Sequence, residues 1–450
     1  MTKSWNLSGV AETTNGEIIG EGNPEITGFT TDSREVREGD LFIGIAGENV
    51  NGGLLARAAV EAGASAALID QTSFDQLGAE TGSLNLVVCE DTREALGRLG
   101  GAARKDLRCP VIGVTGSTGK TSTKDILGAI LAGNGSVFVS AGNRNTEIGM
   151  PLELLTVPDG VGSVVLEMAM RGEGQIAELV TIAEPDAGLI VNVGPVHLET
   201  LGSIERVAAA KCELIAGLRP DSVCVVPAGD SLIEPYLRDD LDTVTFGPGG
   251  DCRLVKVDGR FLTIEFRGEM HRTEVSFDQP HNRLNLLAAA GVALGLGFKI
   301  PDQLTVDFSG HRGQRRALDR GVVVIDDCYN ANPMSMHAAL ADLAGESDRR
   351  GGRKVAVLGD MLELGAETSE LHRQLGVEAT AAGVDILVTV GELSSLAGTT
   401  FDGRHLATGN AAEAAAELLK VLESGDTVLI KASRGVGLEA VTSQLEEEWS

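Results

Sequence analysis

Runs of apolar and β-branched residues alternate along the chain with segments in which apolar residues recur at helical spacing. The clearest case starts at Val111, where an apolar run ends at Thr115 and a turn of small residues follows. Beyond the turn, Ile126, Leu127 and Ile130 recur at the spacing of one helix face. This stretch therefore predicts a buried strand, a loop and a helix.

The same alternation continues on both sides and divides the chain into three units, residues 1–105, 106–309 and 310–450. Strands that alternate with helices are typical of a parallel sheet. We predict an α/β protein with a small α/β N-terminal domain, a central P-loop domain on a parallel sheet, and a C-terminal Rossmann-like, doubly wound domain. The predicted strands lie near residues 26–29, 41–45, 66–69, 86–88, 111–115, 137–140, 163–168, 187–192, 222–226, 322–325, 354–358, 386–390 and 427–430.

Predicted helices lie between these strands. One has an alanine-rich face over residues 54–62, one covers residues 204–218, and a long one runs over residues 281–296. Three short segments with alternating polarity, residues 254–257, 262–266 and 273–277, predict a small antiparallel patch instead.

The composition fits closely packed α/β layers and restricts the class of partner. Of 450 residues, 43% are hydrophobic and only 3% are aromatic. The net charge of −28 argues against nucleic acid or an anionic membrane as a general partner. Six scattered cysteines include no C-x-x-C pair, which favours a reducing compartment. Since no apolar run reaches spanning length and the start lacks an apolar signal core, we expect a soluble cytoplasmic protein.

The turn after the first strand of the central unit has the residue types of a phosphate-binding loop. Gly116 and Gly119 allow backbone N–H groups to close around a phosphate, and the next helix adds the positive end of its dipole. Lys120 can reach the β- and γ-phosphates, and Thr121 can hold Mg²⁺. Val114 stands where the usual motif has glycine, so this is a compact variant. The alternative is an ordinary glycine-rich turn.

Three further polar residues of the central unit are candidate site residues. Glu167 ends a buried strand, where it is either an oxygen ligand for Mg²⁺ or a solvated rim residue. His197 either faces the same crevice or is an ordinary core or loop histidine. Lys211 lies among alanines on a helix, where it either extends harmlessly to solvent or is buried near metal with an altered charge.

Polar clusters in the outer units also contain candidate site residues. Residues 311–316 form a basic cluster in an acidic protein, and residues 326–333, DDCYNANP, follow a buried strand. The second cluster fits ribose or phosphate contacts, or else a plain capped turn. In the first unit, Asp32, Ser33 and Arg34 form either an Asx-turn with a solvated arginine or an anion or nucleotide contact.

Over nearly its whole length, and in order, the chain resembles the ATP-dependent Mur ligases of peptidoglycan synthesis. Residues 359–365, GDMLELG, are characteristic of the member that adds D-alanyl-D-alanine, and they place the carboxylates of Asp360 and Glu363 in the third unit. Two departures are residues 51–55, NGGLL for the frequent D-G-H-D-F, and residues 431–434, KASR for K-G-S-R. The other matching segments are residues 115–121 (TGSTGKT), 143–151 (NRNTEIGMP), 194–199 (GPVHLE), 210–211 (AK), 281–285 (HNRLN) and 326–333.

The resemblance implies a role for each matched residue. Lys120, Lys211 and His197 would be catalytic, and Lys211 matches a lysine that the family carbamylates. Two Mg²⁺ ions would be held by Thr121, Glu167 and His197. ATP would contact Thr115, Gly116, Ser117, Thr118, Gly119, Lys120, Thr121, Ser122, Asn282, Asn285, Arg312 and Asp327. The other substrates would contact Ser33, Arg34, Asn145, Thr146, Tyr329, Asn330 and Arg434.

The implied reaction joins D-alanyl-D-alanine to UDP-N-acetylmuramoyl-tripeptide through an acyl phosphate, with a monomer as the expected catalyst. Metal ions and Lys120 would offset the charge that develops in phosphoryl transfer, while the third domain closes over the second. Three alternatives stay open. A ligase that adds the third amino acid would be expected to carry D-N-P-R, which is absent. A folylpolyglutamate-synthase-like ligase would lack residues 359–365, and a non-catalytic P-loop scaffold would have lost some catalytic residues.

Overall fold

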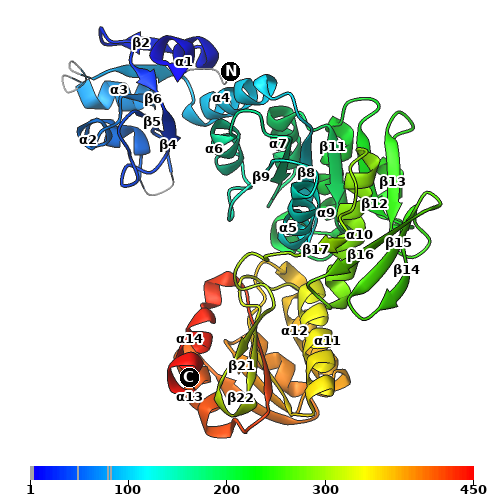
Figure 1. Ribbon diagram of the computed structural model, residues 1–450. Helices are drawn as coiled ribbons and strands as arrows, with labels where there is room; N and C mark the ends of the chain where they lie inside the picture. The colour runs from blue at the N-terminus through cyan, green and yellow to red at the C-terminus, as the bar shows by residue number, and fades with distance from the viewer. Residues whose placement is uncertain (1–4, 48–49, 79–80, 82–83, 450) are drawn as a thin grey trace.

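The computed structural model describes residues 5–47, 50–78, 81 and 84–449. Figure 1 shows three successive lobes, each formed around a β-sheet, with the third lobe beside the central one. No helix among these residues combines the length and the apolar character that a bilayer crossing requires.

The first lobe contains β1 (Trp5–Asn6), β2 (Glu17–Ile19), β3 (Glu25–Ile26), β4 (Gly28–Thr30), β5 (Asp40–Ile43), β6 (Ala66–Asp70), β7 (Leu86–Cys89), α1 (Leu7–Thr14), α2 (Ala56–Glu61), α3 (Gln71–Leu77) and α4 (Thr92–Asp106). Its five-stranded sheet has the order β2-β7-β6-β5-β4 and is parallel except for β2. Alternation along β5 sends Leu41 and Ile43 toward α1 and α4, and Phe42 toward α2. The sheet is therefore buried on both faces.

The central lobe contains β8 (Val111–Thr115), β9 (Val137–Val139), β10 (Ser163–Glu167), β11 (Ala187–Ile190), β12 (Val223–Pro227), β13 (Asp242–Phe246), β14 (Cys252–Asp258), β15 (Phe261–Phe266), β16 (Glu269–Val275), β17 (Gln303–Leu304), α5 (Lys120–Ala132), α6 (Gly149–Thr156), α7 (Gln175–Ala183), α8 (Leu198–Leu201), α9 (Ile204–Gly217) and α10 (Pro280–Gly295). One ten-stranded sheet joins all its strands, in the order β17-β16-β15-β14-β13-β12-β11-β8-β10-β9. Residues of α5 and α10 pack on one face, and those of α7 and α9 on the other.

Strand register brings the predicted site residues to one sheet edge. β8 pairs in parallel with both β10 and β11, so that Glu167 lies beside Val114 and Ile190 beside Thr115. The loop after β8 and the segment after β11 consequently leave the sheet at the same, carboxyl, end. Ligands of open parallel sheets bind at this end.

The third lobe contains β18 (Gln314–Ala317), β19 (Val323–Asp326), β20 (Lys354–Gly359), β21 (Ile386–Val390), β22 (Arg404–Thr408), β23 (Thr427–Lys431), α11 (Pro333–Arg350), α12 (Thr368–Ala381), α13 (Ala411–Val421) and α14 (Glu439–Glu448). Its sheet has the order β18-β19-β23-β20-β21-β22, and only β18 runs antiparallel to its neighbour. Core residues of α11 and α12 cover one face, and those of α13 and α14 the other.

The predicted α/β class, the central parallel sheet and the doubly wound third sheet are confirmed. The helix predicted over residues 54–62 is α-helical only in α2, because a 3₁₀ turn, Gly52–Leu55, precedes it. Part of the predicted basic cluster is strand β18, in which Arg315 and Arg316 pair with β19. The antiparallel patch is confirmed as β14 to β16.

Candidate active site

The loop between β8 and α5 has the backbone of a phosphate cradle. Gly119 caps α5 in the left-handed region, with φ at 76°. A Cβ at Gly119 would lie 2.9 Å from Asn285 Oδ1, and one at Gly116 would lie 3.0 Å from Val191 Cβ. Glycine is therefore required at both positions by close approach, and at Gly119 also by conformation.

Polar contacts to the segment after β11 hold this loop in place. The Gly194 N–H donates to Ser117 Oγ (2.8 Å), and the Thr118 N–H donates to Asn192 Oδ1 (3.0 Å). Lys120 Nζ folds back and donates to Gly116 O at 2.8 Å. The loop is thus ordered by the protein itself, and an anion bound there would replace the carbonyl partner of Lys120.

Glu167 is buried in a pair of hydrogen bonds rather than solvated at the rim. It is 3% exposed, and it accepts from Thr121 Oγ1 at 2.7 Å and from Asn145 Nδ2 at 2.9 Å. The rim interpretation is wrong, because β10 ends below the loop and α5 covers its side chain. A carboxylate and a hydroxyl side by side are the hard oxygen donors that Mg²⁺ prefers. The buried Thr115 hydroxyl has no hydrogen-bond partner among the described residues, which fits a site that a ligand completes.

Lys211 lies close to the phosphate loop, on α9, and is 2% exposed. Among the described residues nothing forms a hydrogen bond or ion pair with its amine. Burial, and then the positive charge of Lys120, lower the pKa of Lys211 well below its ordinary value of 10.5. The interpretation in which Lys211 extends to solvent is wrong. Burial therefore disfavours the charged form of this amine.

Burial also lowers the pKa of Lys120, and Arg312 acts in the same direction while Glu167 opposes both. His197 Nδ1 lies 2.5 Å from Glu363 Oε2. Burial lowers the pKa of His197, and Lys211 and Lys120 lower it further, against the carboxylate of Glu363. Cationic groups from both lobes therefore gather around the phosphate loop.

Glu363 belongs to the third lobe, so its contact with His197 joins two domains. The Glu199 N–H donates to Glu363 O at 3.2 Å, and a Cβ added at Gly365 would lie 3.1 Å from Glu199 Cα. Glu363 has φ at 63°, and its carboxylate also lies 3.9 Å from the Arg171 guanidinium. Residues 359–365 therefore form a docking surface for the central domain, as well as a candidate part of the amine site.

Asn282 and Asn285 lie on α10, buried next to the phosphate loop. Asn285 Nδ2 donates to Asn282 Oδ1 at 3.2 Å, and Asn282 Nδ2 donates to Gln279 Oε1 at 3.4 Å. The close approach of Asn285 to Gly119 ties the start of α10 to the loop. Both amides therefore lie beside the phosphate cradle.

Tyr329 lies between two arginines in the third lobe. The Arg312 guanidinium is 4.0 Å from the ring centroid, and that of Arg434 is 5.4 Å from it. These are distances at which a cation stabilises an aromatic face. The positive charge of Arg312 also lowers the pKa of Lys120, so Arg312 lies within electrostatic reach of the phosphate loop.

Asp327 and Asn330 are held by a buried lysine. Lys431 Nζ donates to Asp327 Oδ2 at 2.7 Å and to Asn330 O at 2.8 Å. The remaining carboxylate oxygen of Asp327 is available to a ligand. Asp360, by contrast, accepts from the Ser394 N–H at 2.7 Å, so it braces its own domain.

Four predicted substrate residues and one predicted ATP contact lie apart from this cluster or make other contacts. Arg34 is 86% exposed and forms an ion pair with Asp32 (2.6 Å), which holds the pKa of that carboxyl at about 2. Ser33 lies in the same turn of the first lobe. Thr146 is exposed at the start of α6, whereas Asn145 is drawn into the Glu167 cluster. Ser122 follows Thr121 on α5 and is half-buried.

Two contacts at the site involve residues with no predicted role there. Asn192 was visible as the residue after a predicted strand, but its amide bonds to Thr118 depend on the β8–β11 register. The contact of Glu363 with His197 joins two domains, and the two residues are 166 positions apart in sequence. A strand-end pattern can indicate the first contact, whereas no local pattern indicates the second.

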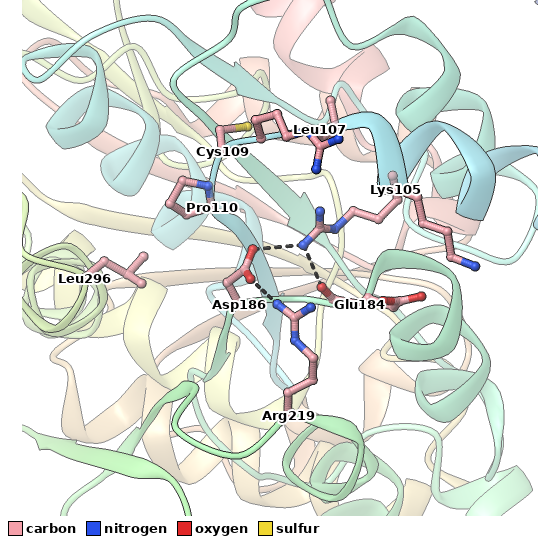
Figure 2. Close-up of a pocket in the computed structure, with 10 residues that line it drawn as sticks. Lys105, Leu107, Cys109, Pro110, Glu184, Asp186, Arg219 and Leu296 are labelled. Atoms are coloured by element: carbon pink, nitrogen blue, oxygen red, sulfur yellow. Dashed lines mark hydrogen bonds and ion pairs between the residues drawn. The ribbon is translucent and has the colours of Figure 1, made fainter. Parts of the chain in front are cut away.

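A cavity of about 570 Å³ lies at the opposite, amino end of β8 (Figure 2). Arg104 Nη2 lies 2.9 Å from Asp186 Oδ2, and Arg219 pairs with the other oxygen of the same carboxylate. The Val111 N–H also donates to Asp186 at 2.9 Å. These bonds join α4 to the central sheet, and the cavity contains none of the predicted site residues.

Known protein families and relatives match most of the length of this chain. Models described as "Mur ligase family, catalytic domain", "Mur ligase middle domain" and "Mur ligase, glutamate ligase domain" match residues 25–104, 114–293 and 311–434. The UDP-N-acetylmuramoyl-tripeptide–D-alanyl-D-alanine ligase of Synechocystis sp. is 36% identical over 436 residues, covering 94% of this chain and 92% of the relative.

Solved structures agree. A crystal structure of MurF from Acinetobacter baumannii matches with a TM-score of 0.90 at 28% identity, over 99% of both chains. The MurF ligase from Thermotoga maritima, in complex with ADP, matches with a TM-score of 0.83 at 30% identity, over 94% of this chain and 97% of that one. Three family models match in succession, and a relative matches over nearly its full length. The phosphate loop also lies beside the acidic end of β10 and the docked third domain. This chain therefore belongs to the Mur ligase family.

Proposed function

We propose that this protein is the ATP-dependent ligase that joins D-alanyl-D-alanine to UDP-N-acetylmuramoyl-tripeptide, forming the pentapeptide precursor of peptidoglycan. The observation that carries the proposal is the contact between residues 359–365 and the phosphate-loop domain through Glu363 and His197. That segment is characteristic of the D-alanyl-D-alanine-adding member, and relatives with this activity in their names match nearly the full length. A scaffold that had lost catalysis would not be expected to keep Lys120 at the loop together with the buried Glu167 and Lys211.

The test is a phosphate-release assay with a panel of UDP-muramoyl peptides and amines. We expect the tripeptide acceptor with D-alanyl-D-alanine to react at least about 100-fold better than with D-alanine, L-lysine or L-glutamate, because each of these leaves polar groups of the site unpaired. If L-lysine or L-glutamate is the best amine, the specificity is wrong. If no acceptor and amine pair releases phosphate, the ligase function is wrong.

The residues support acyl activation by phosphoryl transfer. The peptide carboxylate attacks the γ-phosphate of ATP, giving an acyl phosphate and releasing ADP. The amine then displaces phosphate from the acyl carbon and loses a proton as the amide bond forms. Lys120 and the N-terminus of α5 stabilise the charge that develops on the transferred group. When bound at Glu167 and Thr121, Mg²⁺ would neutralise phosphate charge. Asn285, Asn282, Asp327 and Arg312 are the proposed nucleotide contacts, and Tyr329 and Asn330 are proposed to line the substrate side.

A second Mg²⁺ ion and a carbamate on Lys211 complete the proposed site. The partnerless, buried amine of Lys211 lies near Lys120, and a carbamate there would turn a repulsive neighbour into an attractive one. His197 would hold the second ion with that carbamate. Its side chain is already oriented by Glu363.

The first lobe, residues 1–105, is proposed to hold the uridine-diphosphate part of the acceptor through Ser33 and Arg34. Residues 106–309 and 310–450 are proposed as the ATP and dipeptide domains. The six cysteines are all free thiols, which supports a proposed cytoplasmic location. That the protein acts as a monomer stays a prediction.

Replacing Glu363 by glutamine is expected to lower kcat about tenfold, within the range for a hydrogen bond to a charged group at a partly exposed site. The amide keeps the size of the side chain but loses the charge that faces His197, so the closed domain arrangement is less stable. Steady-state phosphate release measures the effect. Glu367→Gln, an exposed change nearby, should leave kcat unchanged, and equal losses in both variants would contradict the role of Glu363.

Replacing Arg434 by alanine is expected to raise the KM for D-alanyl-D-alanine about tenfold and to leave that for ATP unchanged. Its guanidinium, stacked on Tyr329, is placed to pair with the free carboxylate of the dipeptide. The control is Arg404→Ala, an exposed arginine of the same domain. If Arg434 bridges the domains instead, kcat and both KM values change together, which would refute this assignment.

A further inference from the structure

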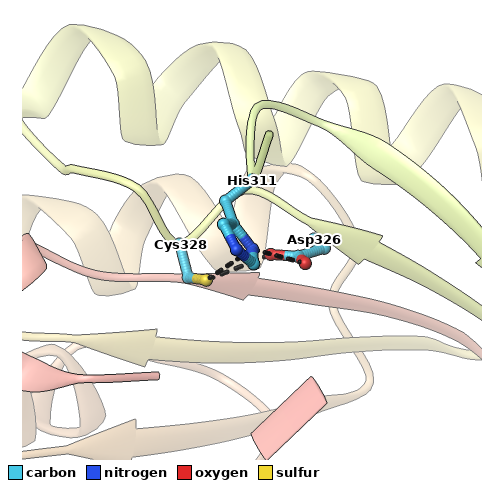
Figure 3. A group of neighbouring side chains, drawn as sticks. All are labelled: His311, Asp326 and Cys328. Atoms are coloured by element: carbon cyan, nitrogen blue, oxygen red, sulfur yellow. Dashed lines mark hydrogen bonds and ion pairs between the residues drawn. The ribbon is translucent and has the colours of Figure 1, made fainter. Parts of the chain in front are cut away.

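A nitrogen, an oxygen and a sulfur donor converge beside the candidate nucleotide site (Figure 3). His311 comes from the connection that precedes β18, Asp326 ends β19, and Cys328 lies two residues further on. His311 Nδ1 is 2.8 Å from Asp326 Oδ2 and 3.8 Å from Cys328 Sγ, while Cys328 Sγ is 3.0 Å from Asp326 Oδ1. His311 thus faces one carboxylate oxygen of Asp326 and Cys328 faces the other, while the imidazole and the thiol also face each other.

The spacing of these atoms is close to that around a tetrahedral metal ion. With Zn–N and Zn–O near 2.0–2.1 Å and Zn–S near 2.3 Å, neighbouring ligand atoms are separated by about 3.3–3.6 Å. Each of the three observed separations differs from this range by about half an ångström or less. Small side-chain rotations would therefore accommodate an ion, without movement of the backbone.

The surroundings of the cluster suit an ion that enters from solvent. Asp326 is fully buried and Cys328 is 3% exposed, whereas the His311 side chain is 43% exposed and opens the cluster to solvent. Arg316 Nη2 lies 3.2 Å from Asp326 Oδ2, and Arg316 Nη1 lies 2.8 Å from Glu446. With a thiolate, two carboxylates, one guanidinium and neutral histidine, a divalent ion brings the net charge to zero.

We propose that His311, Asp326 and Cys328 bind one Zn²⁺ or a similar borderline divalent ion, at a site separate from the Mg²⁺ site at Glu167. Thiolate and imidazole ligands select such ions, whereas Mg²⁺ prefers oxygen ligands only. On binding, the Cys328 thiol releases its proton to solvent and the sulfur–metal bond forms. The ion would link the connection before β18 to the end of β19, and so fix the segments that carry Arg312 and Asp327.

Titration of the full-length, metal-free protein with Co²⁺ in excess Mg²⁺ tests the proposal. We expect one Co²⁺ per chain, with the near-ultraviolet absorption of a thiolate–cobalt bond, and loss of that absorption when Zn²⁺ is added. Cys328→Ser should abolish the absorption, while Cys109→Ser, a half-buried thiol elsewhere, should leave it intact. This readout needs no ligase activity, so its failure and the failure of the proposed function are distinguishable.

A second variant addresses the histidine. His311 has φ at 57°, a conformation that asparagine tolerates, so His311→Asn removes the ligand with little backbone strain. We expect Zn²⁺ to bind this variant at least about tenfold more weakly, and circular dichroism melting to show unchanged folding. Absence of the thiolate absorption from the wild-type protein, or its survival in Cys328→Ser, would overturn the proposal.

Discussion

Alanine in place of Lys120 is expected to lower the ligation rate by at least about two orders of magnitude, the usual cost of losing a preorganised group that stabilises developing charge. In the structure the ammonium of the half-buried Lys120 donates to Gly116 O at 2.8 Å. A phosphate at the cradle would be a stronger acceptor than that carbonyl. Lys120 is therefore poised to follow the γ-phosphate through the transfer.

The measurement is phosphate release at saturating ATP, with ADP binding followed separately by calorimetry. Lys105→Ala changes an exposed lysine at the opposite end of the same sheet and serves as the matched control, with an expected rate close to wild type. Circular dichroism should show that both variants fold. A folded Lys120→Ala protein that turns over at nearly the wild-type rate would refute the assignment.

Much of the central fold was predictable because its elements have strong local patterns. The strand over 111–115 has the predicted bounds, since an apolar β-branched run ends at a glycine-rich turn. Strand β13 and strand β22 were not predicted. In both strands several side chains are partly exposed and polar residues interrupt the apolar run, although β22 is an edge strand and β13 lies inside its sheet. Strand β18 was obscured by its arginines, which pair with carboxylates of β19, α11 and α14.

The candidate site was predictable as a set of residues but not as a set of contacts. Periodicity placed Glu167 at a strand end, yet its burial depends on α5 packing over it. The environment of Lys211 depends on how α9 packs beside the phosphate loop, which a helix of alanines does not specify. Contacts between domains, such as His197 with Glu363, depend on the docking of two separately folded units. No metal-binding motif surrounds Cys328 in the sequence. Cys328 lies near His311 because the end of β19 lies beside the connection that precedes β18.

The protonation of the Lys211 amine determines whether the proposed carbamate can form, and so whether the enzyme is active. Its pKa is lowered by burial, so the neutral form is more populated near pH 7 than for an exposed lysine with a pKa of 10.5. A neutral amine can add CO₂ with release of one proton, and protonation prevents this. The proposed carbamate, and the activity proposed to depend on it, should consequently be lost as the pH falls and retained as it rises.

Lys211→Ala is expected to be nearly inactive and to recover part of its activity when acetate or formate is added, because either anion can supply the missing carboxylate. Lys299→Ala, in the turn after α10, is the control, and it should keep its activity and gain nothing from acetate. In the wild-type protein, ¹³C-bicarbonate should give one carbamate resonance that Lys211→Ala lacks. Removal of CO₂ should lower the wild-type rate, and bicarbonate should restore it. A fully active enzyme with no carbamate resonance would show that Lys211 acts as a neutral amine and that the second metal ion needs another ligand.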